Sequence, residues 1–317
     1  MKIVAVEPIG IEQSLAEEIK GKYQNMGHEF TLHTDRQEDE NALIERMKDA
    51  DIAIVSNIKL SKNVLSECTH LKMLDIAFTG VDHVDLDYCC NHNITVCNAS
   101  GYATEAVSEL AIGLMLDVYR NITPLDAKTR QGGTRNNFLG KQLSGKTAGI
   151  VGTGAIGCRT ALLLQQFGCK VYAWNRSQKK ELSNAGIQYI TLDELLGISD
   201  IISLHVPLTP ETTHLINKEN LCKCKPSAIL INTARGNVVD LQALVLALEA
   251  KTIAAAAFDV FDIEPPLPKN HILFSAPNLW ITPHIGYATR ESFDKRIEIV
   301  FQNIDAYLNG KVINNVM

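Results

Sequence analysis

The stretch that decides the fold is Ala148-Gly149-Ile150-Val151-Gly152-Thr153-Gly154-Ala155-Ile156-Gly157. Its apolar run, its three glycines and the amphipathic residues that follow indicate a buried strand, a tight turn and a helix. In such a turn the first glycine makes the bend, the second lets a ligand approach the backbone, and the third allows close packing of helix and strand. Because a helix N-terminus favours anions, the stretch predicts a phosphate-binding turn on Gly152, Gly154, Ala155, Ile156 and Gly157.

The glycine spacing alone is weak support for a ligand. With 20 glycines among 317 residues, three at this spacing arise by chance about 0.08 times per chain. A tight turn between strand and helix that binds nothing is the alternative. The strand before the turn and the helix after it favour the pyrophosphate site of a dinucleotide.

Short apolar runs alternate with helical patterns on both sides of this stretch. In the second half of the chain the runs are 147–151, 170–174, 201–204, 228–231, 253–258 and 279–281. An earlier set lies at 3–6, 28–32, 52–55, 71–76 and 94–96. Strands that are apolar on both faces and separated by helices indicate parallel sheets covered on both sides. We therefore expect an α/β protein with two doubly wound parallel-sheet domains.

The remaining segments indicate how the two domains connect. A long helix is expected to begin near Thr104, whereas 121–145 is polar and is predicted to be a loop. A final helix, 290–308, has an apolar stripe that needs a surface, and we expect it to return to the first domain. The predicted domains are residues 1–100 with 287–317, and residues 101–286, with a cleft between them.

The composition argues against several classes of protein. The formal charge is −6, from 30 Lys and Arg against 36 Asp and Glu, which gives no reason to expect a nucleic-acid partner. No apolar run reaches the roughly 18 residues of a membrane span, and the chain opens without the pattern of a signal peptide. The eight cysteines lack the paired spacing of a zinc site or a disulfide framework. A cytoplasmic protein that binds neither metal nor membrane is expected.

The residues after the strand 170–174 bear on the choice of cofactor. A carboxylate about 20 residues past the glycine turn would hold the ribose 2′-hydroxyl of NAD. Asn175 and Arg176 stand there instead, with Lys179 and Lys180 close behind. A guanidinium at this corner suits a 2′-phosphate, and a solvated loop with ordinary lysines is the alternative. The corner predicts NADP in preference to NAD.

Three other strand ends carry polar side chains, at the place where an open parallel sheet has its site. Arg235 follows the strand 228–231 and can hold a carboxylate in two parallel hydrogen bonds. Glu264 lies beyond the next strand, and His284 follows the last one. Singly, they could be a surface ion-pair residue, a solvated loop carboxylate and a core histidine. Together they offer a cation for an acid, an imidazole that exchanges a proton near neutral pH and a carboxylate to orient it.

Five motifs in order make the chain resemble the D-isomer-specific 2-hydroxyacid dehydrogenase family, in particular its glyoxylate and hydroxypyruvate reductase-like members. The motifs are Val151-Gly152-Thr153-Gly154-Ala155-Ile156-Gly157, His205-Val206-Pro207-Leu208-Thr209, Asn232-Thr233-Ala234-Arg235-Gly236, Asp259-Val260-Phe261 through Glu264-Pro265, and Thr282-Pro283-His284-Ile285-Gly286. The resemblance implies a flavodoxin-like substrate domain and a Rossmann cofactor domain. It also implies that Arg235 binds and polarises the substrate, and that Glu264 pairs with His284, the proton donor.

The resemblance further implies which residues bind substrate and cofactor. Asn57, Thr79 and Gly80 of the first domain would meet the substrate, together with Arg235 and His284. Cofactor contacts would fall on the glycine turn and on Thr104, Asn175, Arg176, His205, Val206, Pro207, Thr212, Thr233, Ala234, Arg235, Asp259, His284 and Gly286. The implied reaction is hydride transfer between NAD(P) and a small-molecule 2-oxo acid, such as glyoxylate or hydroxypyruvate, that forms a D-2-hydroxy acid.

Other features bear on the alternatives. Tyr287 stands where many members of the family have a small residue, and it is expected to narrow the pocket. Related folds also serve as dinucleotide-sensing corepressors. A phosphoglycerate dehydrogenase is a further alternative, which is disfavoured because the chain ends soon after its last helix, without the regulatory domain that some of these enzymes carry. The resemblance also implies a homodimer, formed through the long helix after residue 101 and the segment 121–145.

Overall fold

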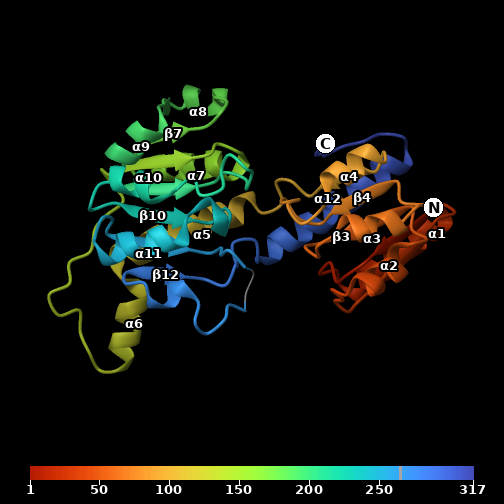
Figure 1. The fold of residues 1–317 in the computed structure, drawn as a ribbon, viewed down its shortest axis with the longest axis horizontal. Helices are drawn as coiled ribbons and strands as arrows, with labels where there is room; N and C mark the ends of the chain where they lie inside the picture. The colour runs from red at the N-terminus through yellow and green to blue at the C-terminus, as the bar shows by residue number, and fades with distance from the viewer. Residues whose placement is uncertain (264–265) are drawn as a thin grey trace. The chain divides into compact units, whose positions relative to one another are not determined.

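The computed structural model describes residues 1–263 and 266–317, which fold into two compact units (Figure 1). Unit 1 comprises Met1–Ala103 and Thr289–Met317, and unit 2 comprises Thr104–Ala288. These bounds lie a few residues beyond those expected from the sequence. Each unit is built on one parallel sheet, so the carboxyl ends of its strands meet at a single edge.

Unit 1 contains a five-stranded sheet with the order β2-β1-β3-β4-β5. Its strands are β1 (Lys2–Ala5), β2 (Glu29–Leu32), β3 (Ile52–Val55), β4 (Met73–Ile76) and β5 (Thr95–Asn98). All residues of β3 and β4 are buried, because helices cover both faces of the sheet. The apolar runs in the sequence predicted each of these strands to within two residues at either end.

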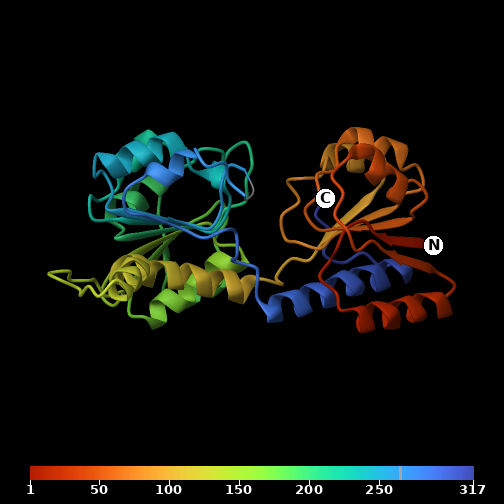
Figure 2. The same ribbon diagram turned by 90° about the horizontal axis from the view of Figure 1, so that it is seen from below.

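The helices of unit 1 form a layer on each face of its sheet (Figure 2). One layer holds α1 (Gln13–Asn25) and α12 (Arg290–Leu308), and the other holds α2 (Glu40–Met47), α3 (Lys62–Glu67) and α4 (Leu86–Asn91). Tyr23 of α1, Phe30 of β2 and Phe301 of α12 pack their rings together, with centroids 5.8 to 6.2 Å apart. The apolar stripe of α12 thus completes the core of unit 1.

Unit 2 contains a seven-stranded sheet with the order β12-β11-β10-β9-β6-β7-β8. Its strands are β6 (Thr147–Val151), β7 (Lys170–Trp174), β8 (Gln188–Tyr189), β9 (Ile201–Leu204), β10 (Ile229–Asn232), β11 (Ala255–Phe258) and β12 (Leu279–Ile281). The strands β6 and β9 pair with each other in parallel. The order in which the chain adds strands to the sheet reverses between these two. Doubly wound sheets bind ligands outside the carboxyl ends of the strands at such a reversal.

The helices of unit 2 also form two layers (Figure 2). Leu182, Leu164 and Met115 belong to the core beneath α5 (Thr104–Arg120), α7 (Ala155–Gln166) and α8 (Lys180–Asn184). The opposite core is covered by α9 (Leu192–Ile198), α10 (Lys218–Lys223) and α11 (Leu241–Glu249). Two short 3₁₀ turns, Gly236–Val238 and Ile272–Ser275, complete the unit. Two covered parallel sheets are therefore the architecture that the sequence predicted.

One segment differs from its prediction. Residues 121–145 were expected to be a loop, but they begin with the helix α6 (Ile122–Arg130). No residue of α6 is buried, so the sequence carries no apolar stripe that would reveal the helix. An ion pair between Arg130 and Asp126, which lie one helical turn apart, supports the helix instead.

Among the helices of the described ranges, none has the length and apolar character needed to cross a membrane.

Candidate active site

The glycine turn follows β6 and is packed so tightly that two of its glycines cannot be replaced without displacing backbone. Gly152 has a φ of +97°, and a Cβ there would lie 2.7 Å from the carbonyl carbon of His205. A Cβ on Gly157 would lie 2.0 Å from the Gly152 oxygen. A Cβ on Gly154 would meet nothing within 4 Å. The first and third glycines are therefore required for packing, while the second leaves open space above the turn.

The helix that starts at this turn has unsatisfied amides at its N-terminus. Among the residues that the structure describes, no side chain caps α7, and the first turn of this helix contains no acidic residue. By contrast, Asp240 caps α11 through the amide of Ala243. The first amides of a helix have no partner within the helix, so those of α7, including Ala155 and Ile156, are available to an anion.

The strands beside the turn end in buried polar atoms that lack partners. Nδ1 of His205 and Oγ1 of Thr233 have no hydrogen-bond partner among the described residues, and they follow the paired residues at the ends of β9 and β10. Burial lowers the pKa of His205 to about 4, so its ring is neutral near pH 7. Its Nε2 lies 2.9 Å from the hydroxyl of Ser203. Buried polar groups without partners point to a ligand, and these residues fit a dinucleotide at this edge.

The loop between β9 and α10 is held by its own hydroxyl groups. The hydroxyl of Thr212 donates to the Pro207 carbonyl at 2.6 Å and accepts from the amide of Thr209 at 2.8 Å. Val206 packs in the core of unit 2, and its side chain would contact a Cβ on Gly152.

Thr104 is the first residue of α5, and its carbonyl oxygen accepts a hydrogen bond from the hydroxyl of Ser108.

The corner expected to choose the cofactor lies after β7. Nδ2 of Asn175 donates to the Ser177 carbonyl at 2.7 Å, and Arg176 is exposed. The pKa of Glu211 is lowered, chiefly by the hydroxyl of Thr209 and also by the positive charge of Arg176. Arg176 therefore lies within electrostatic reach of an acidic side chain from the loop after β9.

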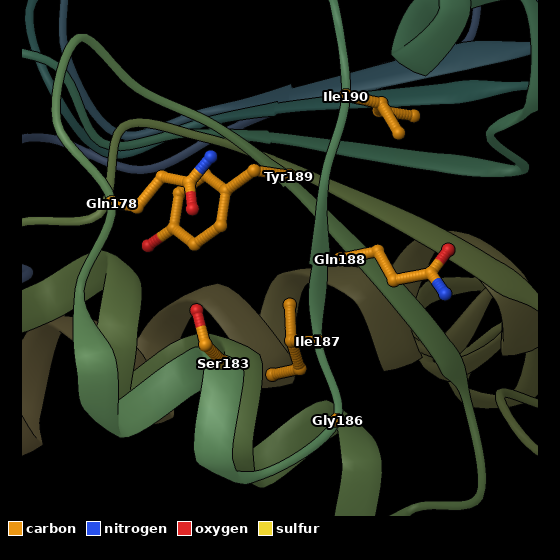
Figure 3. Close-up of a pocket in the computed structure, with 7 residues that line it drawn as sticks. All are labelled: Gln178, Ser183, Gly186, Ile187, Gln188, Tyr189 and Ile190. Carbon is orange, nitrogen blue, oxygen red and sulfur yellow. The ribbon is translucent and has the colours of Figure 1, made fainter.

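Tyr189 connects this corner to the glycine turn. Its hydroxyl accepts from the amide of Lys179 and donates to Oγ1 of Thr153, both at 3.0 Å. Its ring also lines a pocket of about 490 Å³ between α8 and β8, with Gln178, Ser183, Gly186, Ile187, Gln188 and Ile190 (Figure 3). No local motif in the sequence marks Tyr189 as part of this site.

The loop that bears Arg235 is fixed by the residue that ends β10. Asn232 is fully buried; its Nδ2 donates to the Arg235 carbonyl at 2.9 Å, and its Oδ1 accepts from the amide of Ala234 at 3.0 Å. A Cβ on Gly236 would lie 1.9 Å from the carbonyl carbon of Phe261. The Arg235 loop therefore packs directly on the chain that follows β11.

A histidine and an aspartate pair in the chain that follows β11. Nε2 of the buried His271 lies 2.8 Å from Oδ1 of Asp262, which ties the start of this loop to the 3₁₀ turn that follows it. No spacing pattern in the sequence joins these two residues. Glu264, a predicted catalytic residue, lies outside the described residues, as does Pro265.

Asp259 holds the loop that bears His284. Its Oδ1 accepts from the hydroxyl of Thr282 at 2.6 Å and the amide of Ile285 at 2.8 Å, and its Oδ2 accepts from the amide of Gly286 at 2.7 Å. His284 adopts a φ of +55°, which few residues other than glycine adopt. Its ring meets that of Tyr287 edge to face, at a centroid distance of 5.4 Å. Both oxygens of Asp259 therefore serve to shape the His284 loop.

The topology brings most of the predicted residues of unit 2 to one edge of its sheet. The loops of Arg235, Asp259 and His284 follow β10, β11 and β12, which are neighbours in the sheet. The glycine turn follows β6 at the same edge, on the far side of β9. The glycine turn, a guanidinium and an imidazole thus share the carboxyl edge of one sheet.

The predicted residues of unit 1 likewise share an edge of their own sheet. Asn57 follows β3, while Thr79 and Gly80 follow the neighbouring strand β4. Asn57 and Thr79 are exposed. Nδ2 of Asn98, at the end of β5, donates to the Thr79 carbonyl at 2.7 Å. This bond fixes the loop and leaves its amide groups as the available donors.

Comparison with known proteins identifies the family. The NAD binding domain of D-isomer specific 2-hydroxyacid dehydrogenases matches residues 112–286. A glyoxylate reductase of Thermococcus litoralis is 39% identical over 87% of this chain and 86% of its own. A D-3-phosphoglycerate dehydrogenase of Methanocaldococcus jannaschii is 37% identical over 87% of this chain but 53% of its own. The solved structure of an acyclic imino acid reductase (Bsp5) in complex with NADPH and D-Arg has a TM-score of 0.90 and 30% identity, with both chains fully covered. The chain is therefore a member of the D-isomer specific 2-hydroxyacid dehydrogenase family.

Proposed function

We propose that the chain reduces a small 2-oxo acid, such as glyoxylate or hydroxypyruvate, to the D-2-hydroxy acid, and that it prefers NADPH to NADH. The observation that carries the proposal is the shared strand edge in unit 2. There, the glycine turn, the Arg235 loop and the His284 loop all follow parallel strands of one sheet. The similarity to a glyoxylate reductase supports the substrate class.

The chemistry that we assign to the protein is binding, orientation and proton transfer. Reduced nicotinamide, when bound, supplies a hydride to the carbonyl carbon. Arg235 carries the donors that hold the substrate carboxylate and polarise its carbonyl. His284 protonates the carbonyl oxygen as negative charge develops there. Glu264 lies outside the described residues; by its place in the family motif, we assign it as the carboxylate that orients His284.

Asn57, Thr79 and Gly80 are the proposed substrate-binding residues of unit 1. A 2-oxo acid presents only acceptors at its carboxylate and carbonyl oxygens, so a binding site must supply donors. The amide groups of the Thr79–Gly80 loop and the side chain of Asn57 can supply them. The exposure of Asn57 and Thr79 at the ends of β3 and β4 supports this assignment.

The proposed preference for NADPH rests on the corner after β7. Asn175 and Arg176 stand where a carboxylate would select NADH. The exposed guanidinium of Arg176 can bind a 2′-phosphate in two hydrogen bonds. The NADPH bound by the imino acid reductase adds support. The charge of Arg176 also acts on Glu211, so a bound 2′-phosphate would have to replace Glu211 as the neighbour of this guanidinium.

We also infer a cytoplasmic homodimer. All eight cysteines are free, which suits a reducing compartment. The segment around α6 exposes two large apolar side chains, Ile122 at 53% and Leu139 at 83%. Such exposure suits a protein interface. Sedimentation at micromolar concentration would test the dimer, and a purely monomeric species would contradict it.

Steady-state kinetics test the function. Glyoxylate, hydroxypyruvate and 2-oxoisocaproate would be offered with each cofactor, and kcat/KM for NADPH should exceed that for NADH. Arg176→Gln should lower the ratio of kcat/KM for NADPH to kcat/KM for NADH. Arg130 is an exposed, ion-paired arginine of α6, and Arg130→Gln should leave this ratio unchanged. A ratio that favours NADH would refute the cofactor preference. The absence of cofactor oxidation with every acid would refute the proposed activity.

A further inference from the structure

Glu7 is a buried carboxylate that shapes the loop after β3. It follows β1 and is 1% exposed. Its Oε1 accepts hydrogen bonds from three successive backbone amides, those of Ser56, Asn57 and Ile58, at 2.7, 3.0 and 3.1 Å. The backbone position of Asn57 is therefore fixed by a side chain 50 residues away in the sequence.

Arg36 reaches the same loop from the chain that follows β2. Its Nη1 donates to Oε2 of Glu7 at 2.6 Å and to Oδ1 of Asn57 at 2.7 Å. Its Nε donates to Glu38 at 2.9 Å. The guanidinium is thus held by two carboxylates while it contacts the side chain of Asn57.

This contact decides which end of the Asn57 amide is presented. A side-chain amide can turn over and offer either an oxygen acceptor or a nitrogen donor. A guanidinium only donates, so it accepts no hydrogen bond from Nδ2 and must bond to Oδ1. No described residue accepts a hydrogen bond from Nδ2 of Asn57, whose side chain is exposed. The donor end therefore remains for a ligand.

We propose that Arg36 is a positioning residue for the reaction: with Glu7, it locks Asn57 so that the side chain offers its Nδ2 donor to the acid substrate. The inference rests on the proposed function, in which Asn57 meets the 2-oxo acid. Without the lock, the amide also populates the opposite orientation, in which Oδ1 faces an anion. Substrate affinity is then lost, whereas proton transfer by His284 is unaffected.

The test is a kinetic cycle on the full-length enzyme. Arg36→Met should raise KM for glyoxylate by about tenfold, the size of one hydrogen bond to a charged group, with kcat changed less than threefold and the Kd for NADPH unchanged. Arg36→Lys, which keeps the charge and a donor, should recover part of the loss. Glu7→Gln places an amide against the guanidinium and should raise KM as Arg36→Met does.

Two further variants separate positioning from a general structural effect. In an Asn57→Ala background, Arg36→Met should cause no additional rise in KM, because the group that it orients is gone. Lys72→Met is the matched control: Lys72 pairs with Asp51 at 2.7 Å near the amino ends of β3 and β4, and its loss should leave KM unchanged.

The outcomes distinguish the inference from the function on which it rests. An unchanged KM in Arg36→Met, or an equal rise of KM with and without Asn57, would overturn the positioning role while the function stands. A wild-type enzyme that reduces no 2-oxo acid would overturn both. An equal rise of KM in Lys72→Met would likewise overturn the positioning role, since the loss of any surface charge would then be enough to raise KM.

Discussion

His284 combines an unusual backbone conformation with the chemistry that we assign to it. Its φ of +55° is maintained because Asp259 accepts hydrogen bonds from Thr282, Ile285 and Gly286, which surround it. The ring is therefore presented by a loop that has little freedom to move. A general acid must hold its position within hydrogen-bond reach of the group that it protonates.

Replacement of His284 should separate chemistry from cofactor binding. His284→Ala should lower kcat by about 10²- to 10⁴-fold, the usual contribution of a general acid, while the glycine turn still binds NADPH. Stopped-flow measurement of cofactor oxidation, together with fluorescence titration of NADPH, would check this. Turnover close to that of the wild type would contradict the proton-donor role.

Asp75 should make the stability of unit 1 depend on pH. Burial in β4 raises the pKa of its carboxyl from 3.8 to about 8, and a hydrogen bond from Asn303 only partly opposes the shift. Between these values the folded chain keeps a proton that the unfolded chain has lost. The free energy of unfolding therefore falls as pH rises through this range, by up to about 1.4 kcal/mol per pH unit.

The variant Asp75→Asn tests this prediction, because its side chain stays neutral at every pH. Urea unfolding followed by far-ultraviolet circular dichroism would compare it with the wild type from pH 5 to pH 8. The stability of the variant relative to the wild type should increase steadily with pH. A difference that stays constant over the range would show that Asp75 is ionised in the folded chain.

At this scale, the sequence revealed the residues that follow strand ends and hid those held by distant partners. Arg235 and His284 stand directly after apolar runs, so their place at a sheet edge could be inferred. The contact of Arg36 with Asn57 spans 21 positions, and that of Tyr189 with Thr153 spans 36. No local spacing encodes such contacts, because they depend on which strands become neighbours.

Among the elements, the turn from β6 to α7 offers a matched pair of substitutions. Gly157→Ala would place a methyl group against the Gly152 carbonyl, at 2.0 Å before relaxation. It should destabilise unit 2 by about 1–3 kcal/mol, as overpacking does. Gly154→Ala meets no neighbour, so it should alter the stability of the free protein by less than about 0.5 kcal/mol.

The two variants should also differ in how they affect cofactor binding. The methyl group of Gly154→Ala occupies the open space above the turn, so the Kd for NADPH should rise at least about tenfold in a protein of normal stability. Chemical unfolding and calorimetric titration of both variants would check this. Normal NADPH affinity in Gly154→Ala would mean that the pyrophosphate lies elsewhere.

The apolar patterns predicted the long elements well and the short or exposed ones poorly. Both β7 and α12 have the bounds expected from the sequence. The helix α6 has no buried residue, and β8 is only two residues long at the edge of the sheet. Neither buries enough side chain to leave a periodic signal.

At the scale of the whole molecule, the chain leaves unit 1, builds unit 2 and returns with α12. Tyr23 of α1 and Phe301 of α12 nonetheless belong to one aromatic cluster. The apolar stripe of α12 could be read from the sequence because unit 2 was complete without it. A cleft between the two units was an expectation from the two-sheet layout of the sequence, and it stays a prediction.

Cofactor binding should therefore protect the two units unequally. Because the glycine turn and the strands beside it belong to unit 2, NADPH at 100 times its Kd should stabilise that unit by about 2.7 kcal/mol. Hydrogen–deuterium exchange would show slower exchange in β6 and α7 than in the strands of unit 1. Equal protection of both sheets, or protection of unit 1 alone, would contradict this assignment.

The most direct test of the central claim is the reduction of hydroxypyruvate by NADPH, followed by chiral analysis of the glycerate formed. If the chain is a 2-oxo acid reductase of its family, NADPH is consumed in equal amount to the product, and the product is D-glycerate. His284→Ala should slow the reaction by about 10²- to 10⁴-fold under the same conditions. Formation of L-glycerate, or no consumption of NADPH or NADH by any 2-oxo acid, would contradict the account.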